Sequence, residues 1–91
     1  MTNRISKAQL DYLIERINTL TNNPMTYSTR DNGNFKANIG HYHLYGAYGG
    51  IALHQTMNEG GGIHQIIGIS TKRELYDRMQ SLIYGLEHKA A

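Results

Sequence analysis

The chain has 91 residues and a mass of 10.3 kDa, which fits a single domain over residues 1–91. It contains no cysteine, and this excludes a disulfide framework, a cysteine-ligated zinc site and a thiol nucleophile. Nine Lys and Arg residues against seven Asp and Glu residues give a net charge of +2, without the basic stripe that nucleic-acid binders use to neutralise phosphates. No apolar run approaches the roughly 20 residues that a membrane span needs. We therefore expect neither a membrane nor a nucleic-acid partner.

The first predicted element is a helix with clear signals at both ends. Ser6 and Gln9 form a capping box at its start, and Pro24 ends it because proline cannot continue a helix. Its apolar residues recur at the spacing of one buried face: Leu10, Leu13, Ile14, Ile17 and Leu20. Tyr12 falls outside that face, which indicates a contact beyond the core of one chain.

The last predicted element is also a helix. Thr71 and Glu74 form a second capping box. Its buried stripe consists of Leu75, Met79, Leu82, Ile83 and Leu86. Tyr84 lies on the far side of this helix, so a second exposed tyrosine is expected in the helical layer.

Between the helices the apolar residues alternate with a period of two, which predicts strands. The pair Asn32–Gly33 predicts a hairpin turn between strands over 25–30 and 34–39. A bulge at Gly40 carries the second strand on through residue 46, and two further strands follow over 51–57 and 63–69. The predicted fold class is α+β, with a four-stranded antiparallel meander sheet and both helices packed on one face (α-β-β-β-β-α).

The register of these strands separates an apolar face from a ring-bearing face. It sets His43 opposite His54 and Thr56 opposite His64. The apolar face carries Tyr42, Leu44, Ile51, Leu53, Met57, Ile63, Ile67 and Ile69. The other face carries His41, His43, Tyr45, Ala52, His54, Thr56, His64 and Ile66. The helices should cover the apolar face, and we expect nothing else in the chain to cover the other one.

The ring-bearing face is the first candidate for a functional site. Imidazoles on adjacent strands are able to bind Zn²⁺ or Ni²⁺, but no ligand spacing here matches a known metal motif, so no metal is predicted. The seven tyrosines of the chain favour a homo-oligomer interface, because tyrosine brings contact area and a hydroxyl at low entropic cost. Ligand contact is the second interpretation, since tyrosines also stack on nucleobases.

Three further segments are candidates for anion binding. The glycine-rich segments 46–50 and 59–62 lack the strand–glycine–helix order of nucleotide-binding loops, so hairpin turns are the preferred interpretation. Thr71, Lys72 and Arg73 supply a hydroxyl, N–H groups and two cations at the positive end of the last helix, with an ordinary N-cap as the competing interpretation. No Ser–His–Asp arrangement or paired carboxylates occur, so neither enzymatic activity nor a cofactor is predicted.

Parts of the C-terminal half resemble small proteins of tailed bacteriophages. The segments are Gly49-Gly50-Ile51-Ala52-Leu53-His54, Asn58-Glu59-Gly60-Gly61-Gly62, Ser70-Thr71-Lys72-Arg73-Glu74-Leu75-Tyr76 and Leu86-Glu87. This resemblance implies a phage accessory protein in the cytoplasm of the bacterial host. It also implies a role against host defences, either as an oligomer that sequesters cyclic nucleotide or cyclic ADP-ribose signals or as a direct inhibitor of a host protein.

The leading expectation is a non-enzymatic protein that captures a small anionic nucleotide signal between subunits of a homo-oligomer. Tyrosine and histidine rings would stack on the bases, while two cations and glycine-loop amides would hold the phosphates. The candidate ligand-binding residues are His43, Tyr45, Tyr48, His54, His64, Lys72 and Arg73. The alternatives are an inhibitor that docks on a host protein, a nucleic-acid binder and a metal-dependent enzyme.

Overall fold

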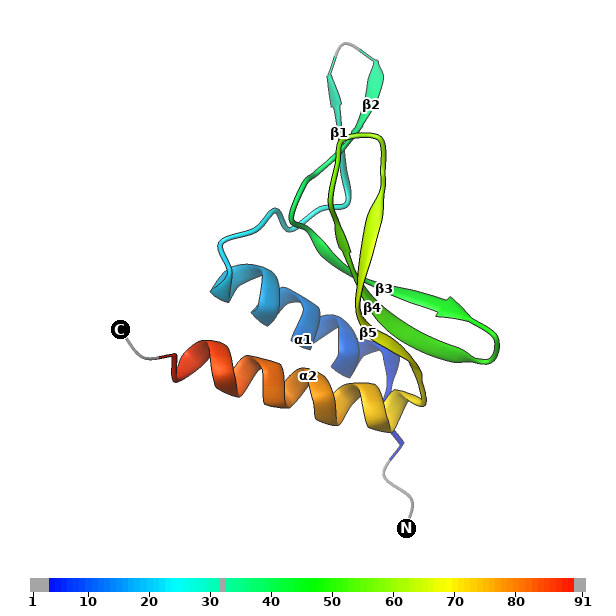
Figure 1. The fold of residues 1–91 in the computed structure, drawn as a ribbon, viewed down its shortest axis with the longest axis vertical. Coiled ribbons are helices and arrows are strands. Elements are labelled where there is room, and N and C mark those ends of the chain that lie inside the picture. Colours follow the sequence, from blue (N-terminus) through cyan, green and yellow to red (C-terminus); the bar gives the residue numbers. More distant parts are fainter. Residues whose placement is uncertain (1–3, 32, 90–91) are drawn as a thin grey trace.

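The computed structural model describes residues 4–31 and 33–89, and all elements below lie in this part of the chain. Helices α1 (Lys7–Leu20) and α2 (Lys72–Glu87) begin and end the element order (Figure 1). The strands between them are β1 (Ser28–Asp31), β2 (Asn34–Ala37), β3 (Tyr42–Ala47), β4 (Gly50–Thr56) and β5 (Ile63–Ser70). They form two antiparallel sheets, β1-β2 and β3-β4-β5. The α+β class is confirmed, whereas the single four-stranded meander is wrong.

Both helices begin where their capping boxes place them. In α1 the Ser6 hydroxyl accepts from the Gln9 N–H and the Gln9 side chain accepts from the Ser6 N–H, at 3.2 and 2.8 Å. Thr71 and Glu74 make the same reciprocal pair at the start of α2, with both bonds at 3.1 Å. Each box satisfies N–H groups that the first turn of a helix leaves unpaired, which fixes both starting points.

The predicted bulge at Gly40 is instead a turn, and it divides one expected strand into β2 and β3. The Asn38 amide donates to the backbone carbonyl of Thr26 at 2.9 Å, and its Oδ1 accepts from the Thr29 hydroxyl at 2.8 Å. Gly40 has a φ of +93°, and a Cβ there would lie 2.3 Å from Oδ1 of Asn23. Only glycine fits this backbone. The alternation of apolar residues continues through the turn and therefore hides it.

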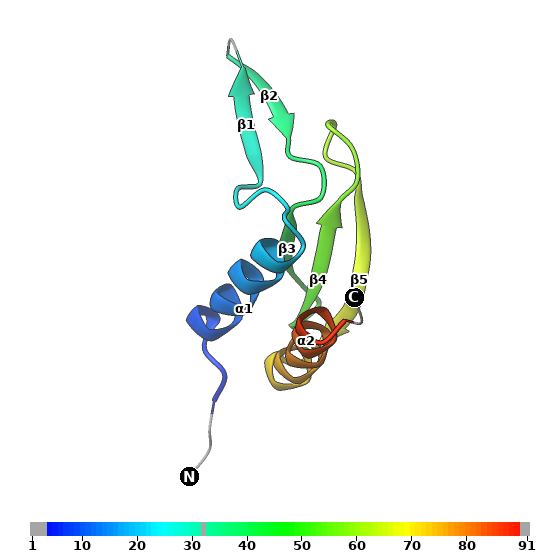
Figure 2. The same cartoon turned by 90° about the vertical axis from the view of Figure 1, so that its left-hand side faces the viewer.

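The hairpin β1–β2 projects beyond the helices, as the two views of the ribbon show (Figures 1 and 2). Its register pairs Arg30 with Phe35, and Asn32 of the predicted turn lies outside the described residues. Glu59, in the loop between β4 and β5, ties the hairpin to the larger sheet. Its carbonyl accepts from the Ala37 N–H at 3.0 Å, and its carboxylate lies 3.6 Å from the ammonium of Lys36. Glu59 thus joins β2 of the hairpin to the loop between β4 and β5 of the larger sheet.

The two helices pack against each other and against one face of the three-stranded sheet (Figure 2). The buried cluster consists of Ile5, Leu10, Leu13, Ile17, Leu53, Leu75, Met79 and Ile83. The molecule measures 50 × 39 × 20 Å, and its radius of gyration of 14.0 Å exceeds the roughly 12 Å of a compact chain of this length. The core is therefore a thin layer, and much of both sheets lies outside it.

Three isoleucine and methionine residues that the sequence placed on the apolar face are exposed instead. Met57 is 52 % exposed because it follows β4 in the part of the sheet that extends past the helices. Ile63 and Ile69 are 46 % and 39 % exposed. Both belong to β5, whose register differs from the prediction.

Asn18 joins α1 to the edge strand β3. Its Nδ2 donates to the Tyr42 carbonyl at 3.1 Å, and its Oδ1 accepts from the Tyr42 N–H at 2.8 Å. The side-chain amide thus bonds the edge as a neighbouring strand would. Asn18 is 1 % exposed, so water does not replace these two bonds in the folded state.

We expect Asn18→Leu to lower the free energy of unfolding by about 2 kcal/mol, because the Tyr42 N–H and carbonyl lose their partners. Urea denaturation followed by circular dichroism measures this change. Thr19→Leu is the control, since it adds the same apolar side chain at the exposed neighbouring position and should change stability by less than about 0.5 kcal/mol. Equal stability of the two variants would contradict the role given to Asn18.

Candidate functional site

Five aromatic rings lie in contact on the sheet face that the helices leave open, and we refer to them as the ring cluster. Tyr45 stacks on His54 with ring centroids 4.6 Å apart and planes inclined by 16°. His43 meets His54 edge-on at 5.9 Å and lies parallel to His41 at 5.7 Å. Tyr27 packs edge-on against His43 at 5.1 Å. The rings therefore form one connected series.

The β3–β4 register brings most of these rings together. His43 lies opposite His54, and Tyr45 lies opposite Ala52, as predicted from the sequence. Residues two apart in a strand share a face, so His41, His43 and Tyr45 point the same way. The short turn between β3 and β4 sets this register, which is why the sequence alone was sufficient here.

The ring-bearing face was expected to be uncovered, and that expectation is wrong for its histidines. The segment before β1 folds back over them, with Tyr27 packed on His43. The carbonyl of Pro24 lies 2.8 Å from Nδ1 of His41, which is 6 % exposed. Tyr45 lies further along β3 and remains 46 % exposed. The segment before β1 thus covers His41 and His43, while the Tyr45 end of the face stays open.

His43 contacts three other rings of the cluster, and its surroundings shift its pKa. Burial lowers the pKa of His43 below its ordinary value of 6.5, because the imidazolium loses hydration. The His41 backbone opposes this shift, while the nearby rings of His41 and His54 add to it. Nδ1 of His43 is buried and has no hydrogen-bond partner among the described residues. His43 is therefore neutral at pH 7.

Acidification should destabilise the fold through His43. As the pH falls below 6.5, the unfolded chain takes up this proton before the folded chain does, so the free energy of unfolding decreases until the lower folded-state pKa is passed. Urea denaturation between pH 8 and pH 5 should show a smaller decrease for His43→Phe than for the wild type. His88→Phe makes the same change at an exposed histidine and is the matched control. Identical slopes for His43→Phe and the wild type would refute the assignment.

His64 does not belong to the ring cluster. β5 carries extra residues relative to β4, so the pairing shifts between Ile51 and Leu53 and again between Leu53 and His54. His64 consequently lies opposite Gln55, and the predicted pairing of His64 with Thr56 is wrong. A shift of one residue moves a side chain to the opposite face, where His64 is exposed.

The same shift moves Ile66, which the sequence placed on the ring-bearing face. Ile66 and Ile67 both pack against the buried core cluster. Two consecutive residues pack on one face because the bulge interrupts the alternation. The placement of Ile66 beside the histidines is therefore wrong, and burial against the helices is the physical reason for the bulge.

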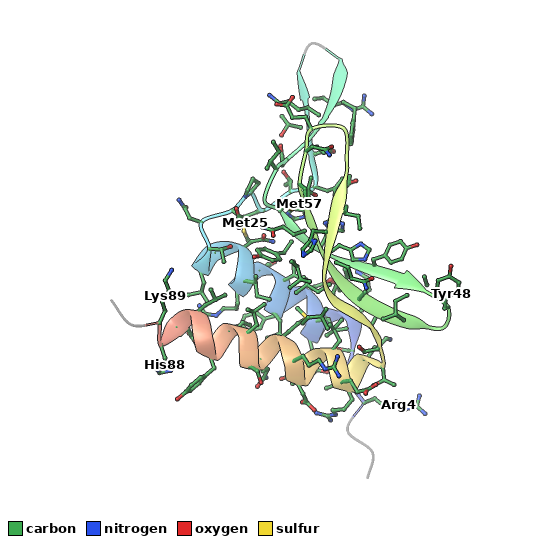
Figure 3. All side chains as sticks on the ribbon, in the orientation of Figure 1. Arg4, Met25, Tyr48, Met57, His88 and Lys89 are labelled. Atoms are coloured by element: carbon green, nitrogen blue, oxygen red, sulfur yellow. The ribbon has the colours of Figure 1, made fainter. Side chains whose placement is uncertain are left out.

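The remaining predicted site residues lie away from the ring cluster. Tyr48 occupies the tip of the β3–β4 turn with a φ of +52° and is 96 % exposed, pointing away from the molecule (Figure 3). Lys72 and Arg73 begin α2 in the helical layer. The guanidinium of Arg73 lies 3.9 Å from the Asp77 carboxylate and 5.9 Å from the centre of the Tyr76 ring. Of the predicted ligand residues, the fold groups only His43, Tyr45 and His54.

Sequence reasoning did not include two residues that shape the ring cluster. Tyr27 was assigned to a strand, and nothing in its local sequence indicates that it folds back onto His43. Gln65 places its Oε1 3.3 Å from Nε2 of the buried His54, and the bulge in β5 brings it there. Both contacts depend on how two segments fold against each other, and the local sequence of those segments does not indicate it.

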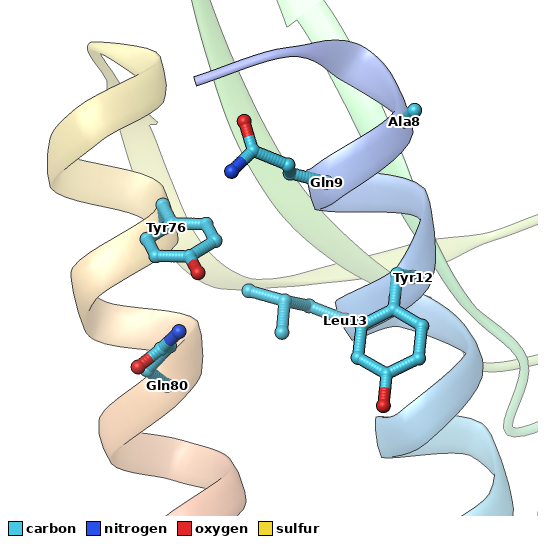
Figure 4. A pocket seen from close by; sticks show the side chains of 6 residues that line it. All are labelled: Ala8, Gln9, Tyr12, Leu13, Tyr76 and Gln80. Atoms are coloured by element: carbon cyan, nitrogen blue, oxygen red, sulfur yellow. The ribbon is translucent and has the colours of Figure 1, made fainter. Parts of the chain in front are cut away.

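A hollow lies between the two helices (Figure 4). Its first part has a volume of about 310 Å³ and is lined by Ala8, Gln9, Tyr12, Leu13, Tyr76 and Gln80. A neighbouring part of about 250 Å³ shares Tyr12, Leu13 and Gln80 and continues toward Tyr84 and the ion pair of Arg16 with Glu87. Tyr12 and Tyr84 are 61 % and 65 % exposed. We refer to this continuous depression as the helical groove.

Neither a metal site nor similarity to a known protein assigns a function to the ring cluster or to the helical groove. Within residues 4–31 and 33–89, no group of three or more His, Asp or Glu side chains is placed to hold a metal ion. Neither described helix is long and apolar enough to cross a lipid bilayer. Comparison with protein-family models, curated proteins and solved structures finds no match to this chain.

Proposed function

We propose that this chain is a non-enzymatic binding protein that holds the planar base of a small nucleotide-derived signal on the ring cluster. The observation that carries the proposal is the Tyr45–His54 stack, with planes inclined by 16°. His54 covers one face of the Tyr45 phenol, yet Tyr45 is 46 % exposed. A nucleobase would continue this stack, and base–aromatic stacking stabilises binding by about 1–3 kcal/mol per base.

The rings are held in place before any ligand arrives. His54 is 5 % exposed and is fixed by the Tyr45 stack, the His43 contact and Gln65. Tyr27 packs on His43 from the other side. A ligand that stacks on Tyr45 therefore orders few further side chains, and this reduces the entropic cost of binding.

The charge distribution supports stacking as the main source of affinity. Lys72 and Arg73 belong to the helical layer, and the central imidazole of His43 is neutral. Phosphate neutralisation by the ring cluster is consequently weak. The affinity should therefore change little with salt, in contrast to the steep salt dependence of proteins that bind through many phosphate contacts.

The resemblance of the C-terminal segments to tailed-phage proteins supports a biological setting for this activity. In that setting the bound signal is a cyclic nucleotide or a cyclic ADP-ribose derivative made by an infected bacterium. Sequestration on the ring cluster would keep the signal from its receptor and thereby block the defence. The chain would act by stoichiometric binding, so no bond of the signal needs to be broken.

Titration calorimetry with cyclic dinucleotides, cyclic trinucleotides and cyclic ADP-ribose isomers tests the proposal. We expect Tyr45→Ala to weaken binding of the recognised compound at least about fivefold, in line with the loss of one stacked ring. Tyr45→Phe should bind nearly as well as the wild type because it keeps the ring. Tyr12→Ala, which truncates an exposed tyrosine of the helical groove, is the matched control and should bind normally.

Failure to bind any compound of the panel would remove the proposed function. Equal affinities of Tyr45→Ala and wild type would remove the ring cluster as its site. A loss of binding in a Lys72→Ala, Arg73→Ala variant, with Tyr45→Ala unaffected, would move the site to the start of α2.

The helical groove favours a second candidate function, direct docking on a host protein. Tyr12 and Tyr84 flank a depression that already contains Tyr76, and tyrosines supply much of the contact area at protein interfaces. The apolar side chain of Leu13 lies at the floor of this depression, between the two helices (Figure 4). This surface is separate from the ring cluster, so substitutions distinguish the two functions.

Affinity capture from a bacterial lysate tests the docking function. The wild-type chain should retain one protein in stoichiometric amount, and Tyr12→Ser combined with Tyr84→Ser should lose it because the exposed rings are removed. Tyr45→Ala is the control and should retain the same partner. Loss of the partner from Tyr45→Ala, but not from the groove variant, would contradict docking through the helical groove.

A further inference from the structure

The outer edge of β5 is unusually poor in the features that normally protect a sheet edge. Among the described strands, β5 has β4 as its neighbour on one side and none on the other. The stretch from Gly60 to Thr71 contains no Lys, Arg, Asp, Glu or Pro. Edge strands usually carry charge or proline, which prevent another strand from adding to them. The bulges of β5 lie beyond Gln65, so they do not protect its first residues.

The hydrogen bonds of Thr56 show which backbone groups of β5 point outward. The Thr56 N–H donates to the His41 carbonyl at 3.0 Å, and the Thr56 carbonyl accepts from the Gly40 N–H at 2.8 Å. The N–H and the carbonyl of Thr56 therefore both point toward β3. Ile63 lies opposite Thr56, and in an antiparallel ladder its own N–H and carbonyl must then face away from β4. By the period of two, Gln65 also directs its backbone groups to the open edge.

We infer that a second copy of this chain pairs with this edge, β5 against β5, in an antiparallel arrangement about a two-fold axis. Centring the pair on His64 uses only the straight segment Ile63–Gln65. Ile63 then lies opposite the partner's Gln65, and each such pair exchanges two backbone hydrogen bonds. His64 lies opposite the partner's His64 at the axis.

Three observations favour a second copy as the occupant. The edge is self-complementary, because its outward donors and acceptors match those of an identical strand related by a two-fold axis. The uncharged stretch from Gly60 to Thr71 brings no like charges together. His64 is exposed on the helical side of the sheet, so neither α1 nor α2 covers the strand at the proposed axis. The pairing also places the ring clusters of both chains on one continuous sheet face.

Sedimentation velocity of the full chain between about 5 and 500 μM, without nucleotide, tests this inference independently of the proposed function. The wild type should form dimers. Ile63→Pro removes the outward N–H but no bond to β4, and proline is tolerated at the first residue of an edge strand. We expect it to raise the dissociation constant at least tenfold. Ile63→Ala keeps the N–H and is the matched control, with a change below threefold.

Charge substitutions at the axis provide a second test that does not depend on proline. His64→Glu and His64→Lys should each weaken the dimer at least tenfold, because equal charges meet at the axis. An equimolar mixture of the two variants should restore association as a heterodimer. His88→Glu, at the exposed residue that follows α2, should leave the dimer unchanged.

A wild type that stays monomeric throughout this range would overturn the inference. Equal dimerisation of Ile63→Pro and Ile63→Ala would overturn it as well, since the outward N–H would then play no part. Failure of the His64→Glu and His64→Lys mixture to associate better than either variant alone would exclude the two-fold pairing centred on His64. Circular dichroism confirms that each variant is folded before it is compared.

Discussion

The arrangement of this small protein depends on the contact between Asn18 and the backbone of Tyr42. The Asn18 amide bonds both polar groups of Tyr42, with distances of 3.1 and 2.8 Å, and thereby fixes α1 against the free edge of β3. Because α1 ends only two residues later, the chain that follows must leave the helix close to this edge. That course carries Pro24 and Tyr27 onto His41 and His43. A buried amide in one helix thus determines how the ring cluster is covered.

The ring cluster shows how a thin fold accommodates several histidines. The helices bury only one face of the sheet, so burial of the other face depends on ring–ring contacts and on the segment before β1. The rings of His41 and His54 lie 5.7 and 5.9 Å from the ring of His43, whose neutral form is favoured by burial. Burial lowers the pKa of His43, the central ring of this packing, and Tyr45 lies at the boundary between the packed part of the face and solvent.

Features set by neighbouring residues were predictable from the sequence. The capping boxes of Ser6 and Thr71 act over three residues, and both helices start where these boxes place them. The alignment of His43 with His54 was also predictable, because a short turn joins their strands and leaves little freedom in the register. Since Tyr45 follows in the same alternation, most of the candidate site on β3 and β4 could be assigned from the sequence alone.

The tertiary structure decided the features that depend on distant residues. Gly40 forms a turn rather than a bulge, and Asn23, which follows α1 in the chain, leaves no room there for a side chain. The bulges of β5 arise where Ile66 packs against the helices, and they send His64 to the opposite face. Tyr27, from the segment between α1 and β1, joins the ring cluster by packing on His43. A pattern of polar and apolar residues indicates which side chains prefer burial, but it does not indicate which distant segment will bury them. That segment is determined only by the packing of helices and sheets in the tertiary structure.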